Sequence, residues 1–410
     1  MGLKNLGGVK MKNILLEKGQ ELHEKLCEIS DYIYKNPELG NQEYKAAEVL
    51  TSFLKEHNFE IEKGLLGIET AFRAIYDSKK EGPTIGYLCE YDALPLIGHG
   101  CGHNMIGSMS SGAGVILSKV IDEVGGRIIV YGTPAEETNG AKVILAEEGV
   151  FDELDVAMMA HPADITAKSG TSMALYPLQF TYKGKTAHAA ACPQDGINAL
   201  NSVIQLFNGI DALRQHVTPD VRMHGIITNG GVAANIVPDE ATAQFYFRAD
   251  KKETLDDLLI KVKKIAEGAA LMTGATLEMT RYELPNDNLI TNENLSEAFT
   301  ENLKALGITD IHESRKCGSS DIGNVSHKTP TIHPFIGITN CPLTSHTVEM
   351  ADATTTKLGG HWIYCSGVNV SYVSCLWPMP IVALSIYWWI LRKYNTKNRL
   401  LYNKLIKISI

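Results

Sequence analysis

The pattern of apolar and polar positions changes character twice along the chain. From residue 11 to 57, apolar residues recur at helical spacing on both sides of a Pro/Gly break at 36–40, which predicts two helices. Further along, short apolar runs that favour strands alternate with helical segments. The strands are predicted at 69–77, 84–92, 126–134 and 154–162, and the helices at 110–124 and 140–151. This alternation indicates an α/β fold with a mostly parallel sheet wrapped by helices.

A different order of predicted elements begins near residue 175. Its order is strand, helix, strand, strand, helix, strand, which predicts a ferredoxin-like α+β arrangement. The six segments are predicted at 176–184, 197–217, 222–231, 240–250, 252–274 and 275–284. We therefore expect an inserted domain at 175–286, which interrupts a first domain made of residues 1–174 and 287–357.

Chemically active side chains gather where the predicted strands of the first domain end, which is where α/β sheets carry their sites. The strand at 84–92 leads into EYDALPLIGHGCGHN, a stretch that contains Asp92, His99, Cys101, His103 and Asn104. Three roles for Cys101 compete: a nucleophile, half of a disulfide, or a metal ligand. The answer decides what kind of site this is.

Metal binding is the role of Cys101 that the spacing favours. A cysteine and a histidine two residues apart in an extended loop point the same way, and thiolate with imidazole suits zinc and similar metals. A Cys–His nucleophilic pair usually brings its members from distant positions. The 8 cysteines form no dense framework, so we expect mostly free thiols. A nucleophilic or a purely structural thiol remains an alternative.

Two further strand ends and one polar loop add candidates. Glu136 and Glu137 follow the strand at 126–134; on an extended backbone they point to opposite sides, so one can bind metal while the other acts as a general base. His161 follows the apolar run at 154–162, and His346 lies in the loop TSHTVEM. Each has an ordinary alternative, a solvated Glu pair or a hydrogen-bonded structural histidine. Together with Cys-x-His they can fill two metal positions.

The inserted domain carries its own polar candidates. His188 lies in the Gly-containing stretch GKTAHAA, and Asn235 and Arg248 lie in and after NIVPDEA. An arginine can bind a carboxylate through two parallel hydrogen bonds, and a histidine or asparagine can stabilise an oxyanion. A surface histidine, a turn asparagine and a surface arginine are the alternative interpretations.

Taken together, these motifs resemble metallopeptidase family twenty, in its amidohydrolase subfamily. The passage IGYLCEYDALPLIGHGCGHN is the most specific, and GTPAEET, GKTAHAA, NIVPDEA and HTVEMADAT follow in the right order. The resemblance covers roughly residues 20 to 357 and is greatest to the dipeptidase branch of that family. It implies a zinc-peptidase-like catalytic domain with an inserted domain that acts as a lid and as a dimerisation module.

The resemblance also implies roles for individual residues. It implies two divalent metal ions, zinc or manganese, held by Cys101, His103, Glu137, His161 and His346. Glu136 would be the general base, and Asp92 would orient one of the metal-ligating side chains without itself binding the metal. His188, reaching across a homodimer, would hold the substrate or the oxyanion, and Asn235 and Arg248 would contact the carboxylate side of the substrate.

The expected function is metal-dependent hydrolysis of the amide bond of a small N-acyl amino acid or a dipeptide. A dipeptidase restricted to unblocked dipeptides is the nearest alternative. A ligand-binding homologue without catalysis is a second alternative, although the presence of Glu136 argues against it, because a binding protein needs no base.

The net charge of the chain bears on its partners. A net charge of −9 gives no sign of a basic face, so nucleic acid is not an expected partner.

The two ends of the chain bear on its location. The N-terminal residues carry scattered charges and lack the apolar core of a signal peptide, which predicts a cytoplasmic protein. Residues 358–410 do not fit the family pattern, because no Asp, Glu, Lys or Arg occurs between Lys357 and Arg392. Two explanations compete for this apolar end: a membrane anchor through residues 370–391, or a frameshifted terminus. We favour the second, and with it a protein that is not membrane-bound.

Overall fold

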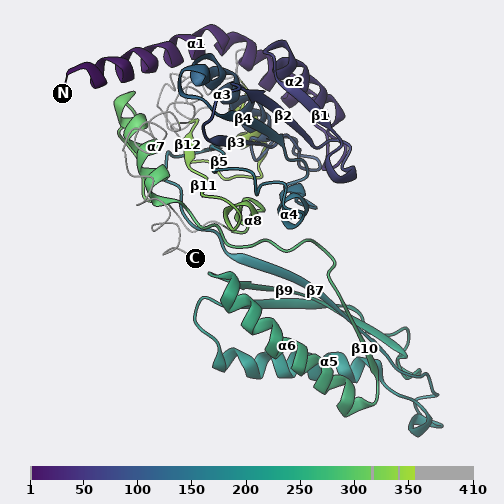
Figure 1. Cartoon of the computed structure of the whole chain (residues 1–410). Helices are drawn as coiled ribbons and strands as arrows, with labels where there is room; N and C mark the ends of the chain where they lie inside the picture. The colour runs from purple at the N-terminus through teal and green to yellow at the C-terminus, as the bar shows by residue number, and fades with distance from the viewer. Residues whose placement is uncertain (1, 315–317, 340–341, 356–410) are drawn as a thin grey trace. The chain divides into compact units, whose positions relative to one another are not determined.

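The computed structural model of the chain describes residues 2–314, 318–339 and 342–355, which form two compact units (Figure 1). The first unit comprises residues up to Gly170 and, from Ile290, most of the remaining described chain. The second unit is Thr171–Leu289 together with the short segment that ends at Asn324. The apolar C-terminal stretch at 358–410 lies outside the described residues.

A six-stranded sheet forms the centre of the first unit. Its strands, in spatial order, are β1 (Glu60–Lys63), β2 (Phe72–Asp77), β4 (Arg127–Gly132), β3 (Thr84–Cys89), β5 (Val156–Met158) and β11 (Thr331–Ile332). From β4 to β11 all neighbours are parallel, whereas β1 and β2 pair antiparallel at one edge. All six residues of β3 are buried, as expected for a parallel strand covered on both faces. The predicted mostly parallel sheet is confirmed.

Helices and short strands complete the first unit. Its longer helices are α1 (Gly2–Lys35), α2 (Tyr44–Glu56), α3 (His103–Val124) and α7 (Glu293–Ala305), and its short helical pieces are η1 (Leu65–Gly67), α4 (Ala141–Glu147) and α9 (Val348–Ala353). The helix α8 (Ile322–Ser326) begins within the segment that belongs to the second unit. A separate parallel pair is formed by β6 (His161–Ala163) and β12 (Phe335–Gly337). The helix α3 packs on β3 and β4, and α1 packs on α3 (Figure 1).

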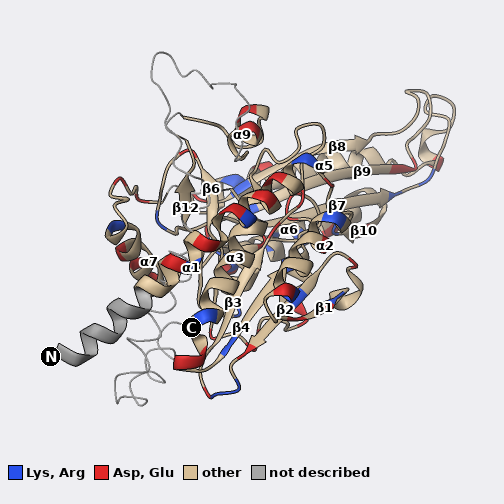
Figure 2. Cartoon of the chain, turned by 90° about the horizontal axis from the view of Figure 1, so that it is seen from above, with Lys and Arg blue, Asp and Glu red and all other residues tan. Residues whose placement is uncertain are grey.

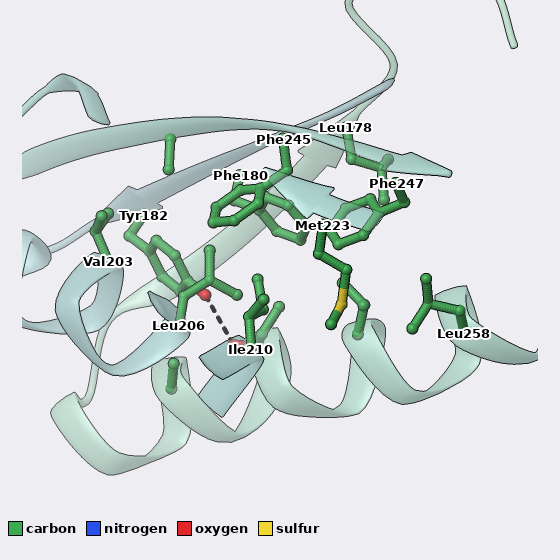
Figure 3. Packing of buried hydrophobic residues seen from close by; sticks show 14 of the residues in the cluster. Leu178, Phe180, Tyr182, Val203, Leu206, Ile210, Met223, Phe245, Phe247 and Leu258 are labelled. Atoms are coloured by element: carbon green, nitrogen blue, oxygen red, sulfur yellow. Dashed lines mark hydrogen bonds between the residues drawn. The ribbon is translucent and has the colours of Figure 1, made fainter. Parts of the chain in front are cut away.

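The second unit has the predicted ferredoxin-like order. Its elements are β7 (Ala174–Lys183), η2 (Pro193–Asp195), α5 (Ala199–Leu213), η3 (Arg214–His216), β8 (Arg222–Asn229), β9 (Glu240–Ala249), α6 (Lys252–Thr273) and β10 (Thr276–Thr280). The antiparallel sheet has the order β10-β7-β9-β8. One face of this sheet packs on the two helices through Phe180, Phe245 and Phe247, and the Tyr182 hydroxyl donates to the Ala266 carbonyl at 3.0 Å (Figure 3).

Charged residues are scattered over the described elements. Acidic and basic positions are interspersed along the ribbon, and no basic face stands out in the view of Figure 2. Among the described residues, no helix is both long enough and apolar enough to cross a membrane.

Candidate functional site

The strands β4, β3 and β5 lie side by side and run parallel, so their carboxyl ends share one edge of the first unit's sheet. Asp92 follows β3, and Glu136 and Glu137 follow β4, as expected. The apolar run at 154–162 is not a single strand, however. It breaks after Met158, and His161 begins the separate strand β6, which pairs with β12. The histidine is therefore fixed at the start of a strand.

Cys101 and His103 are brought together by a turn, and the extended loop predicted for them is wrong. Gly102 between them has a φ of +80°, and His103 is the first residue of α3, which begins seven residues before the predicted start at 110. A Cβ at Gly102 would lie 2.4 Å from Cγ of Pro162, so only glycine fits against this proline. The close approach places Cys101 Sγ 3.5 Å from Nε2 of His161.

The imidazole ring of His103 is held by the carboxylate of Asp92. Its Nδ1 lies 2.9 Å from Asp92 Oδ1, and both residues are about 1% exposed. The Nε2 atom of His103 is buried without a hydrogen-bond partner among the described residues. Burial disfavours a charged imidazole, but Asp92, Cys101 and Glu90 together outweigh burial and raise the pKa of His103 well above its usual value. A carboxylate that accepts from Nδ1 leaves Nε2 directed at a possible metal ion.

Glu136 and Glu137 lie in a turn rather than on an extended backbone, which corrects the prediction that they point to opposite sides. The turn is set by Ala135, whose φ is +63°. The other oxygen of Asp92, Oδ2, accepts the backbone N–H of Glu137 at 2.9 Å. One ligand atom from each of His103, Glu136 and Glu137 lies within 4.8 Å of the others. The carboxylates of Glu136 and Glu137 therefore both lie beside the ring of His103.

His346 joins this group from a distant loop. Its backbone N–H donates to the Gly100 carbonyl at 2.9 Å, and its φ is +66°. Its Nε2 lies 3.4 Å from Oε1 of Glu137, which is itself buried without a hydrogen-bond partner among the described residues. Cys101, Glu137 and His346 form one set of candidate ligands, and Cys101, His103 and His161 form another.

The distances within the cluster fit divalent metal ions. Two nitrogen or oxygen ligands, each about 2.1 Å from a tetrahedral ion, are separated by about 3.4 Å, and a sulfur–nitrogen pair by about 3.6 Å. The pairs His346–Glu137 at 3.4 Å and Cys101–His161 at 3.5 Å match these spacings. Burial raises the pKa of Cys101 to about 12 and lowers that of His161 to about 4. A cation would reverse the first effect, because coordination deprotonates a thiol.

Three buried residues at this site were missed by the sequence analysis. Glu90 is 1% exposed, and its Oε1 lies 2.6 Å from Nζ of Lys142, which is fully buried on α4. Burial opposes ionisation of Glu90, but Lys142 and His103 outweigh burial and lower its pKa. Glu43, at the start of α2, accepts the Ala135 backbone N–H at 2.9 Å. For Glu90, the available signal in the sequence was a carboxylate directly after a mostly apolar strand. The sequence held no comparable signal for Lys142 or Glu43.

His99 and Asn104, which the sequence placed beside the candidate ligands, have other surroundings. His99 is 2% exposed, and burial lowers its pKa to about 4. It does not appear in any group of candidate ligands among the described residues. The side-chain amide of Asn104 donates to the Ser30 hydroxyl at 3.1 Å, which ties the start of α3 to α1.

The candidates of the second unit fall into two places. The backbone N–H of Ala189 donates to the Asn235 carbonyl at 3.0 Å, so the loops that carry His188 and Asn235 lie side by side. Nδ1 of His188 accepts from the Ala190 and Ala191 N–H groups at 3.3 and 3.2 Å, which leaves Nε2–H free to donate. Arg248 lies near the far end of β9, where it bonds Ser319 Oγ at 3.0 Å.

Comparison with known proteins adds independent findings. Residues 177–272 match a family described as the peptidase dimerisation domain. The chain is 37% identical over 364 residues to Xaa-Arg dipeptidase of Mus musculus, covering 84% of this chain and 83% of the relative. It is 36% identical over 354 residues to Xaa-Arg dipeptidase of Homo sapiens, covering 81% of each chain. It is 32% identical over 305 residues to one of the subunits of p-aminobenzoyl-glutamate hydrolase of Escherichia coli, covering 69% of this chain and 63% of the relative.

Solved structures show the same fold. A putative aminohydrolase from methicillin-resistant Staphylococcus aureus superposes with a TM-score of 0.74 at 18% identity, covering 92% of this chain and all of that one. A dinuclear metal binding peptidase from Bacillus subtilis superposes with a TM-score of 0.66 at 20% identity, covering 90% of this chain and 99% of that one.

Proposed function

Because this chain belongs to the M20 family of peptidases, we propose that it is a metal-dependent hydrolase that cleaves the amide or peptide bond of a small substrate. The observation that carries this proposal is the convergence of one thiol, three imidazoles and two carboxylates at one edge of the first unit's sheet. Their donor atoms come from separate segments of the chain, an arrangement that local folding alone does not require.

Two divalent metal ions are the cofactors that this set would hold. The ligands we assign are Cys101, His103, Glu137, His161 and His346. Thiolate and imidazole favour zinc, and the carboxylate of Glu137 is a ligand that manganese also accepts. When bound, such ions supply Lewis-acid activation of water and of the scissile carbonyl. Asp92 orients the site, since it accepts from the His103 ring and from the Glu137 backbone at once.

Glu136 is the residue that we assign to proton transfer. Its carboxylate lies beside the candidate ligands His103 and Glu137, which is where a base must lie to take a proton from an attacking water. The same carboxylate then carries that proton to the nitrogen of the leaving amine. In this scheme Glu136 needs no bond to an ion, so its loss affects turnover and leaves metal content intact.

Replacing Glu136 with Gln tests the proposal. We expect turnover to fall by a factor of about 10² to 10⁴ or more, with unchanged metal content by plasma mass spectrometry. Glu148→Gln, an exposed carboxylate just beyond α4, is the matched control and should keep full activity. Normal turnover by Glu136→Gln would show that the assigned mechanism is wrong.

We further propose that His188 and Asn235 act on the substrate of a partner subunit. They lie before the start of β9, whereas Arg248 is eight residues into that strand. At about 3.3 Å per residue, roughly 26 Å separate the two places, which is too far for one small substrate to contact both within one chain. A homodimer that combines His188 and Asn235 of one chain with Arg248 of the other removes this difficulty.

The edge strand β8 is the surface that supports such a dimer. It is the last strand of the second unit's sheet, and it leaves one row of backbone groups unpaired within that sheet. Ile226 and Ile227 on this strand are 63% and 45% exposed, and Val232 beyond it is 87% exposed. Exposed apolar residues on an edge strand favour pairing with a second copy.

The substrate we propose is a dipeptide or an N-acyl amino acid with a free carboxylate. Arg248 supplies the guanidinium for that carboxylate. On the same face of β9, the hydroxyl of Tyr246 donates to Glu283 Oε2 at 2.6 Å, which places a carboxylate near Arg248. Such a group favours a basic side chain in the C-terminal residue, in agreement with the relative named Xaa-Arg dipeptidase.

Assays on matched substrates separate these possibilities. An unblocked dipeptide that ends in arginine is compared with its N-acetyl form and with a dipeptide that ends in alanine. Hydrolysis of the unblocked forms alone identifies a dipeptidase. Preference for the acetylated form identifies an N-acyl-amino-acid hydrolase.

A further inference from the structure

Glu90 and Lys142 form a buried ion pair that the roles above leave unused. Glu90 follows β3 directly, and Lys142 lies in the first turn of α4. Their side chains are 1% and 0% exposed, and Nζ of Lys142 lies 2.6 Å from Oε1 of Glu90. Replacing a buried ion pair with apolar residues of similar volume is often neutral for stability, so the pair is weak evidence of a stabilising role.

The second oxygen of Glu90 faces the candidate metal site. Its Oε2 lies 3.4 Å from Nε2 of His103, on the side of the ring that is turned away from Asp92. This equals the distance between His346 Nε2 and Glu137 Oε1, and it matches the roughly 3.4 Å expected for two ligands of one tetrahedral ion. A carboxylate oxygen of Glu90 also lies within 4.8 Å of one from Glu136.

We propose that Glu90 is an additional oxygen ligand of the divalent metal ion that His103 binds, and that Lys142 orients this carboxylate through its other oxygen. The inference rests on the proposed function, because it requires a site that binds divalent ions. One oxygen of Glu90 lies 2.6 Å from Nζ of Lys142, and the other lies 3.4 Å from Nε2 of His103. A purely structural ion pair would not require the second oxygen to stand at ligand distance from His103.

The test removes both charges together. Glu90→Gln/Lys142→Met removes both charges of the pair, and circular dichroism and thermal unfolding without metal check that the variant folds. Zinc and manganese affinities are then measured by competition with a chromogenic chelator. We expect at least one of the two sites to bind at least tenfold more weakly than in the wild-type chain. Lys18→Met/Glu21→Gln removes an exposed ion pair on α1 and should bind metal like the wild type.

Each outcome decides the matter. Equal metal affinity in the wild-type chain and the double variant overturns the role of Glu90 and leaves the proposed function standing. Absence of divalent metal binding by the wild-type chain overturns both. If the double variant does not fold, a crystal structure of the manganese-loaded wild-type chain takes its place. Glu90 Oε2 within about 2.6 Å of an ion is expected, and a separation beyond about 3.5 Å refutes the proposal.

Discussion

Replacement of Glu43 with Gln should make the stability of the protein less dependent on pH. Glu43 is fully buried at the start of α2, where its carboxyl accepts the N–H of Ala135 at 2.9 Å and the hydroxyl of Thr70 at 2.9 Å. Burial, reinforced by the nearby charge of Asp92, raises its pKa from 4.5 to about 7. The hydrogen bonds that it accepts act in the opposite direction and do not overcome burial.

The sign and size of the effect follow from this shift. A carboxyl whose pKa is higher in the folded state binds its proton more tightly there, so its contribution to stability is complete below pH 4.5 and is lost as the pH rises through 7. The difference between 4.5 and about 7 corresponds to about 3 kcal/mol, at about 1.4 kcal/mol per pKa unit. Glutamine is neutral at every pH and has no such loss.

The assay is urea unfolding of the metal-free wild-type and Glu43→Gln chains at intervals from pH 4.5 to 8.5. The free energy of unfolding of the variant, minus that of the wild type, should rise by about 3 kcal/mol across this range. Thr70→Val removes a hydrogen bond that favours the charged carboxyl, so it should displace the same transition to higher pH. A difference between variant and wild type that stays constant across the range would refute the reasoning.

Three other predictions concern the site and the second unit. Asp92→Asn should weaken metal binding about 10- to 100-fold in chelator competition, because His103 loses the carboxylate that orients it; unchanged affinity would contradict this. Arg248→Lys should raise KM for substrates with a free carboxylate and leave KM unchanged for their amide forms, a difference that steady-state kinetics measures. Ile226→Lys places a charge on the edge of β8, and sedimentation should show a monomer; a dimer at the same concentration would exclude β8 as the interface.

The sequence was sufficient for most elements and for the second unit because their periodicities are regular. In the second unit, β7 and β9 alternate buried and more open positions over most of their length, and α5 and α6 bury one face each, so the six segments appear in the predicted order. The short edge strand β1, at 60–63, was not predicted; with one half-buried and three exposed residues it shows no apolar pattern.

The site was predictable where it depends on spacing and not where it depends on tertiary burial. Cys101 and His103 could be singled out from their separation of two residues, but the left-handed turn at Gly102 packs against Pro162, which lies 60 residues further along. Lys142 resembles a solvent-exposed lysine in a short helix, and only the fold shows that it points at Glu90. His99 and His103 look equivalent in the sequence, and their different partners become visible only in three dimensions.

The contact between Gly102 and Pro162 also has a consequence for the order of assembly. The turn that aims Cys101 and His103 has no room to relax once β6 is in place, and β6 itself depends on pairing with β12, more than 170 residues further along the chain. The helix α3 can form early from local interactions, but the thiol and the two imidazoles converge only when these distant strands have docked. During refolding, metal uptake should therefore report the docking of β6 on β12. The far-ultraviolet circular dichroism signal, which reports helix formation, should develop earlier than metal uptake.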